Sequence, residues 1–219
     1  MNFNFQKARD LMVENQLRPN KITEPTILDL FKNTKKEDFL SEELKKISYS
    51  DLDINLDINR GYLKNLHIAQ LIHNSLIKEQ DKVLHIGGLT GYVSVMLAAL
   101  CKELIVIEHQ KKLIKKIEEN IKNLNINNLK IINSAFQDGC VKESPYDIIF
   151  IDNPIFELSN SFKDQLNSKY GKIIMIKKID NYLCKAYRIT KNNNNYTNEF
   201  LFDVFTKYEL YRKRAEFIL

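Results

Sequence analysis

The sequence predicts an α/β fold built on a mostly parallel, doubly wound sheet. From residue 82 onward, five short apolar runs rich in β-branched residues follow one another, and helix-length segments separate the first four. Such alternation indicates βαβ units. After residue 180 the pattern changes to two longer runs joined by the Asn-rich segment KNNNNYTN, which is typical of an antiparallel hairpin. We therefore expect a parallel sheet that ends in an antiparallel carboxy-terminal pair.

The amino-terminal part is expected to be a small helical extension. Helical apolar spacing occurs in ARDLMVENQL, PTILDLFKN and EELKKI, which turn-forming segments such as RPNKITEP separate. The following SYSDLDINLDINRG is polar and alternates only weakly, so it predicts an ordered loop or a short edge strand before a helix at about 62–78. We divide the chain into a helical extension with a substrate-side loop, residues 1–60, and a main domain, residues 61–219.

The strands of the main domain are expected at KVLHI, ELIVIE, LKIIN, YDIIFID and GKIIMI. Right-handed crossovers through the intervening helices predict the order 3-2-1-4-5 for residues 82–176, with LKIIN at one edge. The hairpin of residues 182–206 is expected to complete the sheet beside the fifth strand.

Composition narrows the class of protein. The chain has 219 residues, 44% of them hydrophobic, and no apolar run approaches the roughly 18 residues of a membrane helix. With no signal-peptide pattern at the amino terminus, we expect a cytoplasmic protein with no membrane partner. The net charge of +5 comes from dispersed lysines and permits a nucleic-acid partner without indicating one. Cys101, Cys140 and Cys184 are too widely spaced for a metal knuckle, so we expect idle reduced thiols and no metal.

Glycine placement indicates a ligand site in the stretch VLHIGGLTGY. The chain has six glycines, and Gly87, Gly88 and Gly91 fall in one loop directly after a strand. Glycine lets the backbone approach a ligand closely, and the helix that follows points its amide groups at whatever binds. Glu108 ends the next strand, where a carboxylate can accept hydrogen bonds from both ribose hydroxyls. Its alternative is a solvated residue at a helix start, but the pairing with the glycine loop favours the ribose role.

The spacing of the loop favours S-adenosylmethionine over a dinucleotide. Gly-Gly-Leu-Thr-Gly fits G-x-G-x-x-G poorly, whereas Gly87 and Gly91 match the methyltransferase pattern acidic-x-G-x-G-x-G. A parallel sheet with an antiparallel carboxy-terminal pair is also typical of the Rossmann-like class I methyltransferase fold, although topology alone is compatible with other nucleotide-binding folds.

Separated segments in the right order resemble the protein-L-isoaspartate O-methyltransferase family, in its alphaproteobacterial variant lineage. They are ARDLMVENQLRPNKITEPTILDLF, KKEDFLSEELKKISYSDLD, VLHIGGLTGY and SPYDIIFID. The resemblance implies S-adenosylmethionine as the cofactor, a protein or peptide substrate, and methyl transfer to a protein carboxylate in protein repair. It implies cofactor contacts from His85, Gly87, Gly88, Leu89, Gly91, Glu108, His109, Ala135, Phe136 and Asp152.

The sequence also departs from the family pattern. No Ser or Thr lies between Arg60 and Gln70, where the family carries an active-site hydroxyl. His85 stands where an acidic residue is usual, and Leu89 replaces the central glycine of the loop. The family has a Gly-Asp-Gly motif that contacts the adenine, and this motif aligns with residues 134–136, which are Ser, Ala and Phe here. Asp138 would match the motif's aspartate only if the alignment were shifted by three residues. We expect reduced cofactor affinity, limited more by Leu89 than by His85, and isoaspartyl methylation that is absent or far below that of a typical member.

The end of the fourth strand leaves three functions open. Asp152 is the candidate catalytic residue, and a helix or turn cap is its alternative role. The segment Asp152-Asn153-Pro154 is close to the Asn-Pro-Pro-aromatic motif of methyltransferases that modify nucleobase amino groups, although Ile155 breaks it. A non-catalytic binding module of the same fold is the third hypothesis. His67 and His73 lie six residues apart, which does not fit a zinc pair on a helix.

Overall fold

The computed structural model describes residues 3–193 and 195–211. Its α-helices are α1 (Phe5–Met12), α2 (Pro25–Asn33), α3 (Glu42–Lys45), α4 (Asn65–Ser75), α5 (Tyr92–Ala98), α6 (Lys111–Asn123) and α7 (Asn160–Asp164). Short 3-10 or π-helical segments are η1 (Val13–Leu17), η2 (Arg18–Asn20), η3 (Lys36–Phe39), η4 (Phe136–Asp138) and η5 (Val141–Glu143). The strands are β1 (Ile54–Asn55), β2 (Gly61–Tyr62), β3 (Lys82–Ile86), β4 (Glu103–Ile107), β5 (Leu129–Ile132), β6 (Ile148–Ile155), β7 (Lys172–Lys178), β8 (Leu183–Asn192) and β9 (Asn195–Phe205).

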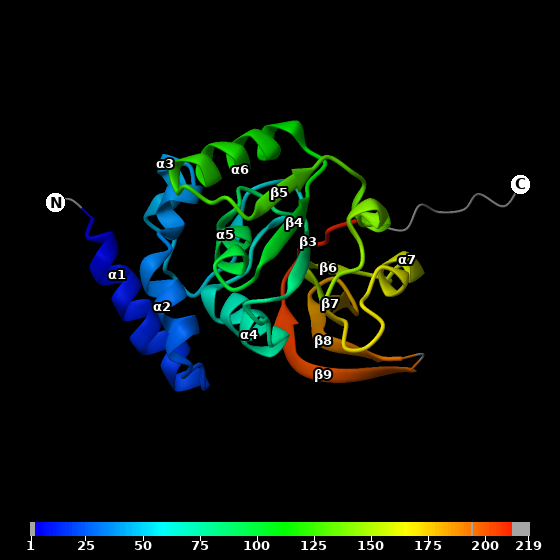
Figure 1. The fold of residues 1–219 in the computed structure, drawn as a ribbon. Helices are drawn as coiled ribbons and strands as arrows, with labels where there is room; N and C mark the ends of the chain where they lie inside the picture. Colours follow the sequence, from blue (N-terminus) through cyan, green and yellow to red (C-terminus); the bar gives the residue numbers. More distant parts are fainter. Residues whose placement is uncertain (1–2, 194, 212–219) are drawn as a thin grey trace, which may run out of the picture.

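The main sheet confirms the predicted topology. Its order is β5-β4-β3-β6-β7-β8-β9, which is the expected 3-2-1-4-5 arrangement with the hairpin beside the fifth strand. The strands β3 to β7 pair in parallel, β7 pairs with β8 antiparallel, and LKIIN forms the edge strand β5. Figure 1 shows this sheet between helices on its two sides. The fold is therefore the Rossmann-like methyltransferase architecture that the sequence predicts.

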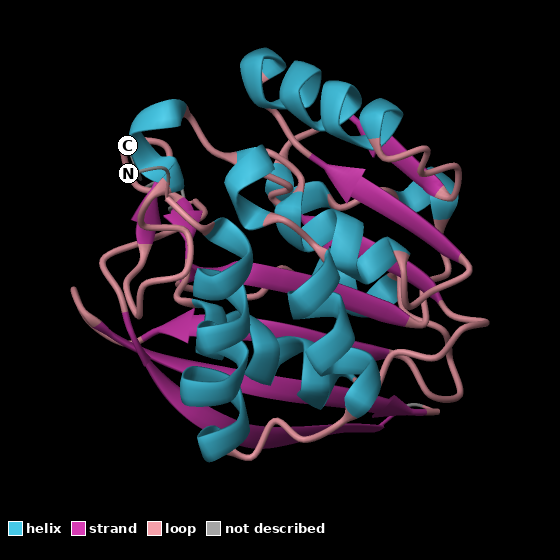
Figure 2. Ribbon diagram, turned by 90° about the vertical axis from the view of Figure 1, so that its left-hand side faces the viewer, coloured by secondary structure: helices cyan, strands magenta, loops and turns pink. Residues whose placement is uncertain are grey.

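The sheet separates two hydrophobic clusters, and the strand side chains alternate between them. In β4, Leu104 and Val106 belong to the first cluster, whereas Ile105 and Ile107 belong to the second. The first cluster also holds side chains of the amino-terminal helices and of α4, α5 and α6, and the second holds those of α7 and η4. Figure 2 shows helices crossing in front of one face of the sheet. Burial on both faces explains why these strands read as continuous apolar runs.

The boundary expected at residue 60 falls inside a local two-stranded ribbon. Ile54 and Asn55 of β1 pair antiparallel with Tyr62 and Gly61 of β2. The polar segment before residue 60 therefore forms a short strand, which is one of the two predicted alternatives, but its partner belongs to the expected main domain. The helix predicted at 62–78 is shorter, Asn65–Ser75, because Tyr62 belongs to the ribbon and Leu76, with a φ of 52° in the left-handed region, ends the helix.

The amino-terminal region is fixed to the main domain through a buried lysine. Lys36 of η3 is fully buried, and its ammonium group donates a hydrogen bond of 2.9 Å to the side-chain oxygen of Asn65. The same ammonium lies over the rings of Tyr62 and Tyr92, 5.6 and 5.4 Å from their centroids. Burial lowers the pKa of Lys36 from 10.5 to about 7.

Candidate active site

The glycine loop connects β3 to α5 at the carboxyl edge of the sheet. Gly87 and Gly91 have φ angles of 89° and 98°, which L side chains rarely adopt. Gly88 is required for packing, since a Cβ there would lie 2.5 Å from a Val106 methyl carbon and 2.9 Å from Ile117. Gly91 is the N-cap residue of α5. The loop therefore has the strand-turn-helix geometry expected for a cofactor site.

Leu89 differs from its expected role. It has a φ of 53°, in the left-handed region, and its side chain is fully buried in the first cluster. The side chains that lie against Gly87 come from elsewhere: a Cβ there would meet Leu210 at 2.7 Å and Arg60 at 3.3 Å. Leu210 belongs to the second cluster, on the opposite face of the sheet. The structure thus gives no support to obstruction by the Leu89 side chain.

Glu108 follows β4 and is completely buried. Its carboxylate accepts backbone hydrogen bonds from Leu89 (3.2 Å), His109 (2.9 Å) and Gln110 (3.1 Å). Arg60 adds a two-point contact: Nη1 donates to Oε1 at 3.2 Å and Nη2 donates to Oε2 at 2.7 Å. The expected pairing of Glu108 with the glycine loop is present, but a protein cation occupies the place expected for the ribose hydroxyls.

The aromatic side of the site consists of Phe136 and His109. The guanidinium carbon of Arg60 lies 4.7 Å from the centroid of the buried Phe136 ring. The His109 ring meets Phe136 edge-on at 4.5 Å between centroids. Ala135, the N-cap residue of η4, is exposed at the same place. Phe136 and His109 therefore lie beside the pair of Arg60 and Glu108, and Arg60 lies over the Phe136 ring.

His85 and Asp152 form a closed internal network. The His85 ring is fully buried, with Nδ1 2.9 Å from the hydroxyl of Ser94 and Nε2 3.3 Å from Oδ1 of Asp152. Asp152 lies within β6, which continues to Ile155, so neither a helix cap nor a turn cap describes it. Asp152 lies on the central strand of the sheet and is 3% exposed. In this arrangement its carboxylate therefore serves as a hydrogen-bond partner of His85.

Asn153 is committed to the ribbon. Its side-chain nitrogen donates to the carbonyl of Gly61 at 3.3 Å, and its oxygen accepts from the Gly61 amide at 3.4 Å. The residue is 1% exposed. An asparagine that receives a nucleobase amino group must present a free oxygen to the ligand, so the geometry does not favour the nucleobase hypothesis.

Two residues at this site were not predicted from the sequence, Arg60 and Leu210. Arg60 could have been suspected because it stands beside Gly61, at the start of the segment that lacks the family's hydroxyl. Nothing in the sequence around Leu210 indicates that it lies at the site. The hydroxyls that do lie near the loop are used structurally: those of Tyr62 and Thr90 are 2.7 Å apart, and Thr90 also donates to the carbonyl of Phe39.

Two depressions near this edge are lined by described residues. A shallow one of roughly 350 Å³ lies outside Arg60 and is lined by Asp57, Asn59, His109, Gln110, Glu209 and Tyr211 among others. A second, of roughly 520 Å³, lies beside Tyr208 and is lined by Asp53, Lys64, His67, Tyr182, Phe205 and Thr206 among others. A Cβ at Gly61 would lie 2.6 Å from the Tyr208 hydroxyl, so the second groove adjoins the ribbon next to Arg60.

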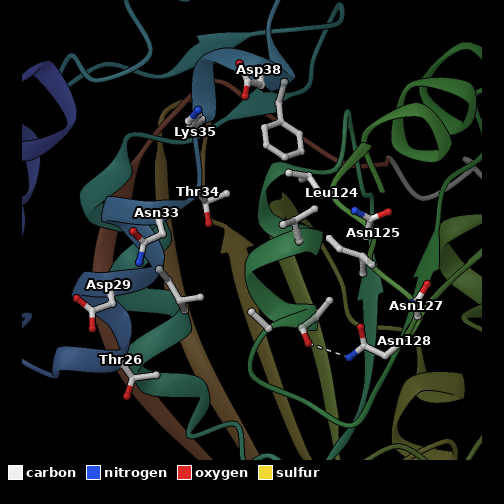
Figure 3. Close-up of a pocket in the computed structure, with 16 residues that line it drawn as sticks. Thr26, Asp29, Asn33, Thr34, Lys35, Asp38, Leu124, Asn125, Asn127 and Asn128 are labelled. Carbon is white, nitrogen blue, oxygen red and sulfur yellow. Dashed lines mark hydrogen bonds between the residues drawn. The ribbon is translucent and has the colours of Figure 1, made fainter. Parts of the chain in front are cut away.

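A roomier groove of roughly 710 Å³ lies away from this edge (Figure 3). It runs between α2, α5 and the connection from α6 to β5, and none of its lining residues belongs to the glycine loop. Asn128, labelled in Figure 3, donates to the carbonyls of Ala98 and Cys101 at 2.9 and 3.0 Å. Its amide therefore ties the groove wall together.

Among residues 3–193 and 195–211, no group of three or more His, Cys, Asp or Glu side chains could hold a metal ion. In the same part of the chain, no helix has the length and hydrophobicity needed to cross a membrane.

The fold and the glycine-loop edge define a methyltransferase of the Rossmann-like class. The family model described as "Protein-L-isoaspartate(D-aspartate) O-methyltransferase (PCMT)" matches residues 7–204, and the chain belongs to that family. The enzymes of this family are S-adenosylmethionine-dependent methyltransferases.

Individual relatives agree with this assignment. The chain is 26% identical to a protein-L-isoaspartate O-methyltransferase of Herpetosiphon aurantiacus over 163 residues, covering 74% of this chain and 73% of the relative. It is 27% identical to that of Dictyoglomus turgidum over 195 residues, covering 89% and 87%. A solved Plasmodium falciparum structure, titled a putative member of the family in complex with S-adenosyl-L-homocysteine, superposes with a TM-score of 0.73. It is 22% identical, and the match covers 96% of this chain and 100% of that one.

The side chains, as arranged, do not fit the family's cofactor. Arg60 and three amides use the carboxylate oxygens of Glu108, Arg60 covers Phe136, and Leu210 lies against Gly87. The backbone of the loop has the family's geometry, so the conflict lies in these side chains.

Proposed function

We propose that this protein transfers a methyl group from S-adenosylmethionine to a carboxylate of a protein substrate, with isoaspartyl residues as the acceptor in protein repair. The observation that carries the proposal is the family match over residues 7–204 together with Glu108 beside a glycine turn at the sheet's carboxyl edge. We assign the ribose to Glu108 and the adenine side to Phe136 and His109, once Arg60 has moved away.

The acceptor chemistry is compatible with the lost hydroxyl. A carboxylate is already ionised at neutral pH, so no general base is needed to activate it, and positioning carries most of the rate. A chain without Ser or Thr between Arg60 and Gln70 therefore lacks a positioning group, and no proton acceptor is lost. This supports methyl transfer as the reaction while predicting low activity on isoaspartyl peptides.

For the protein substrate we propose the groove beside Tyr208. Leu52, Tyr182 and Phe205 line it and are exposed. Exposed aromatic side chains around a concavity favour a peptide over a small polar ligand. We also place the protein in the cytoplasm, in agreement with the three unpaired thiols among the described residues.

Transfer of the tritiated methyl group from S-adenosylmethionine to an isoaspartyl peptide tests this function. We expect slow, measurable transfer that depends on the isoaspartyl linkage, at a rate far below that of a family member that keeps the active-site hydroxyl. Phe205→Ala should raise KM for the peptide and leave cofactor binding unchanged. If neither the wild type nor variants with an opened cofactor site methylate any isoaspartyl peptide, the proposal is wrong.

A further inference from the structure

Arg60 holds Glu108 in a way that excludes another ligand. The guanidinium and carboxylate form a two-point ion pair with contacts of 3.2 and 2.7 Å, and both side chains are almost completely buried. Three backbone amides take the remaining acceptor positions of the carboxylate. A ribose can bind Glu108 only by replacing Arg60, because the amides belong to the loop backbone that forms the site.

Leu210 closes the same site from another part of the chain. Its side chain lies against Gly87, where a Cβ would be 2.7 Å from Leu210 Cδ1. The segment is fixed by two backbone hydrogen bonds, from the Leu210 amide to the Pro154 carbonyl (2.7 Å) and from the Glu209 amide to the Asn59 carbonyl (2.9 Å). The second of these connects the segment to the residue just before Arg60. Both closing side chains are therefore held by one set of contacts.

We propose that Arg60 and Leu210 form a self-inhibitory closure of the cofactor site, and that cofactor binding requires both side chains to withdraw. This inference rests on the proposed function for the identity of the ligand. Because only the open fraction binds, the apparent affinity falls in proportion to that fraction. A closure that is open in about one molecule in a hundred weakens binding about a hundredfold.

Two features favour withdrawal over a permanent seal. The Nε of Arg60 is buried without a hydrogen-bond partner, so the closed form leaves one donor of the guanidinium unsatisfied. Arg60 also ends a tight turn in which its carbonyl accepts from the amides of Leu56 and Asp57, and Ile58 at the tip is 86% exposed. Since this turn lies at the surface, the Arg60 side chain can swing outward while the hydrogen bonds between Gly61 and Asn153 of β6 stay in place.

Calorimetric titration with S-adenosylhomocysteine tests the closure. Arg60→Ala and Leu210→Ala should each tighten binding at least about tenfold relative to wild type, and the double variant should bind more tightly than either. Arg9→Ala is the matched control for the first, because Arg9 forms another buried ion pair, with Glu37 at 3.4 Å. Leu166→Ala is the control for the second, because Leu166 is buried in the same cluster as Leu210. Neither control should tighten binding.

Hydrogen exchange at the Leu210 amide gives a second readout that does not depend on variants. The Leu210 side chain leaves Gly87 together with its backbone segment, so a saturating ligand should break the bond from the Leu210 amide to Pro154 and accelerate exchange of this amide, while it protects the glycine loop. Protection of both segments would contradict the closure. Equal affinity of wild type, Arg60→Ala and Leu210→Ala would also overturn it, and the Leu210 variant decides the question if Arg60→Ala does not fold.

The two proposals fail in different ways. Opened variants that bind S-adenosylhomocysteine more tightly but never methylate a peptide would keep the closure and refute the methyltransferase function. A wild type that binds as tightly as the opened variants and methylates isoaspartyl peptides would keep the function and refute the closure.

Discussion

Wild-type stability should rise between pH 7 and pH 9, and replacing Lys36 with methionine should remove this pH dependence. Lys36 is fully buried between Tyr62 and Tyr92, and its pKa is lowered to about 7 from the 10.5 of an exposed lysine. Between these two values the unfolded chain holds a proton that the folded protein lacks. Stability therefore rises with pH in this range, and the dependence disappears below pH 7, where both states are protonated.

The magnitude follows from the shift. Each pH unit inside the window contributes about 1.4 kcal/mol, so the free energy of unfolding should rise by about 2.5 kcal/mol from pH 7 to pH 9 through Lys36 alone. Opposing charges such as Asp53, which raises the pKa of Lys36, are secondary to burial. Methionine fills a similar volume without an ionisable group, so Lys36→Met should lack this slope whatever its stability at a single pH.

Urea unfolding at pH 7, 8 and 9 measures the effect as the difference between wild type and variant. Lys130→Met is the control, because Lys130 is exposed and the ion pair with Glu143 raises its pKa, so it stays charged throughout this range. Parallel stability profiles of wild type and Lys36→Met between pH 7 and pH 9 would refute the reasoning. The result bears on the site because Tyr62, which Lys36 contacts, bonds the Tyr92 amide directly after the glycine loop.

Three further results are expected. Leu89→Gly should destabilise the protein by about 2 kcal/mol in urea unfolding, because the loss of a fully buried leucine side chain costs more than the relief of a φ of 53° gains. It should not tighten S-adenosylhomocysteine binding, and tighter binding would show that the Leu89 side chain obstructs the site. His67→Gln should flatten the fall in stability from pH 6.5 to pH 4, since burial lowers the pKa of His67 to about 4 and acid must charge it; unchanged acid unfolding would contradict this. In the Arg60→Ala background, adding Glu108→Ala should weaken S-adenosylhomocysteine binding more than about tenfold in calorimetry, and an unaltered affinity would remove Glu108 from the ribose site.

Sequence patterns predicted the sheet because local periodicity and connection length decide it. The apolar runs of β3 to β7, the helix-length spacers and the Asn-rich turn each act over a few residues, and together they leave one strand order. The strand boundaries were less predictable. β6 extends through Asp152 to Ile155 because Ile155 pairs with Lys177 after an irregularity in the register, which no periodicity shows.

The candidate site was predictable only as far as its backbone. The glycine loop is predictable because Gly87 and Gly91 stand where the backbone needs a positive φ to turn from strand to helix. Glu108 is predictable because it ends the next strand, beside that loop. The partner of Glu108 was missed because Arg60 is 48 residues away in the chain, and such pairing depends on how the ribbon of β1 and β2 packs onto the sheet. The same holds for His85, whose partners Ser94 and Asp152 come from α5 and β6.

A closure made of side chains explains how the family fold can persist beside a filled site. The polar groups that a ligand would meet here already have protein partners: Glu108 has Arg60, His85 has Asp152, and Asn153 has the backbone of Gly61. Separating the partners of a buried ion pair is strongly destabilising, because it leaves an uncompensated buried charge. Withdrawal of Arg60 from the completely buried Glu108 therefore costs more than withdrawal of Leu210, whose contact with Gly87 is apolar. The depth of the closure then depends mainly on the ion pair, and the Arg60→Ala variant should show the larger gain in affinity if this division is correct.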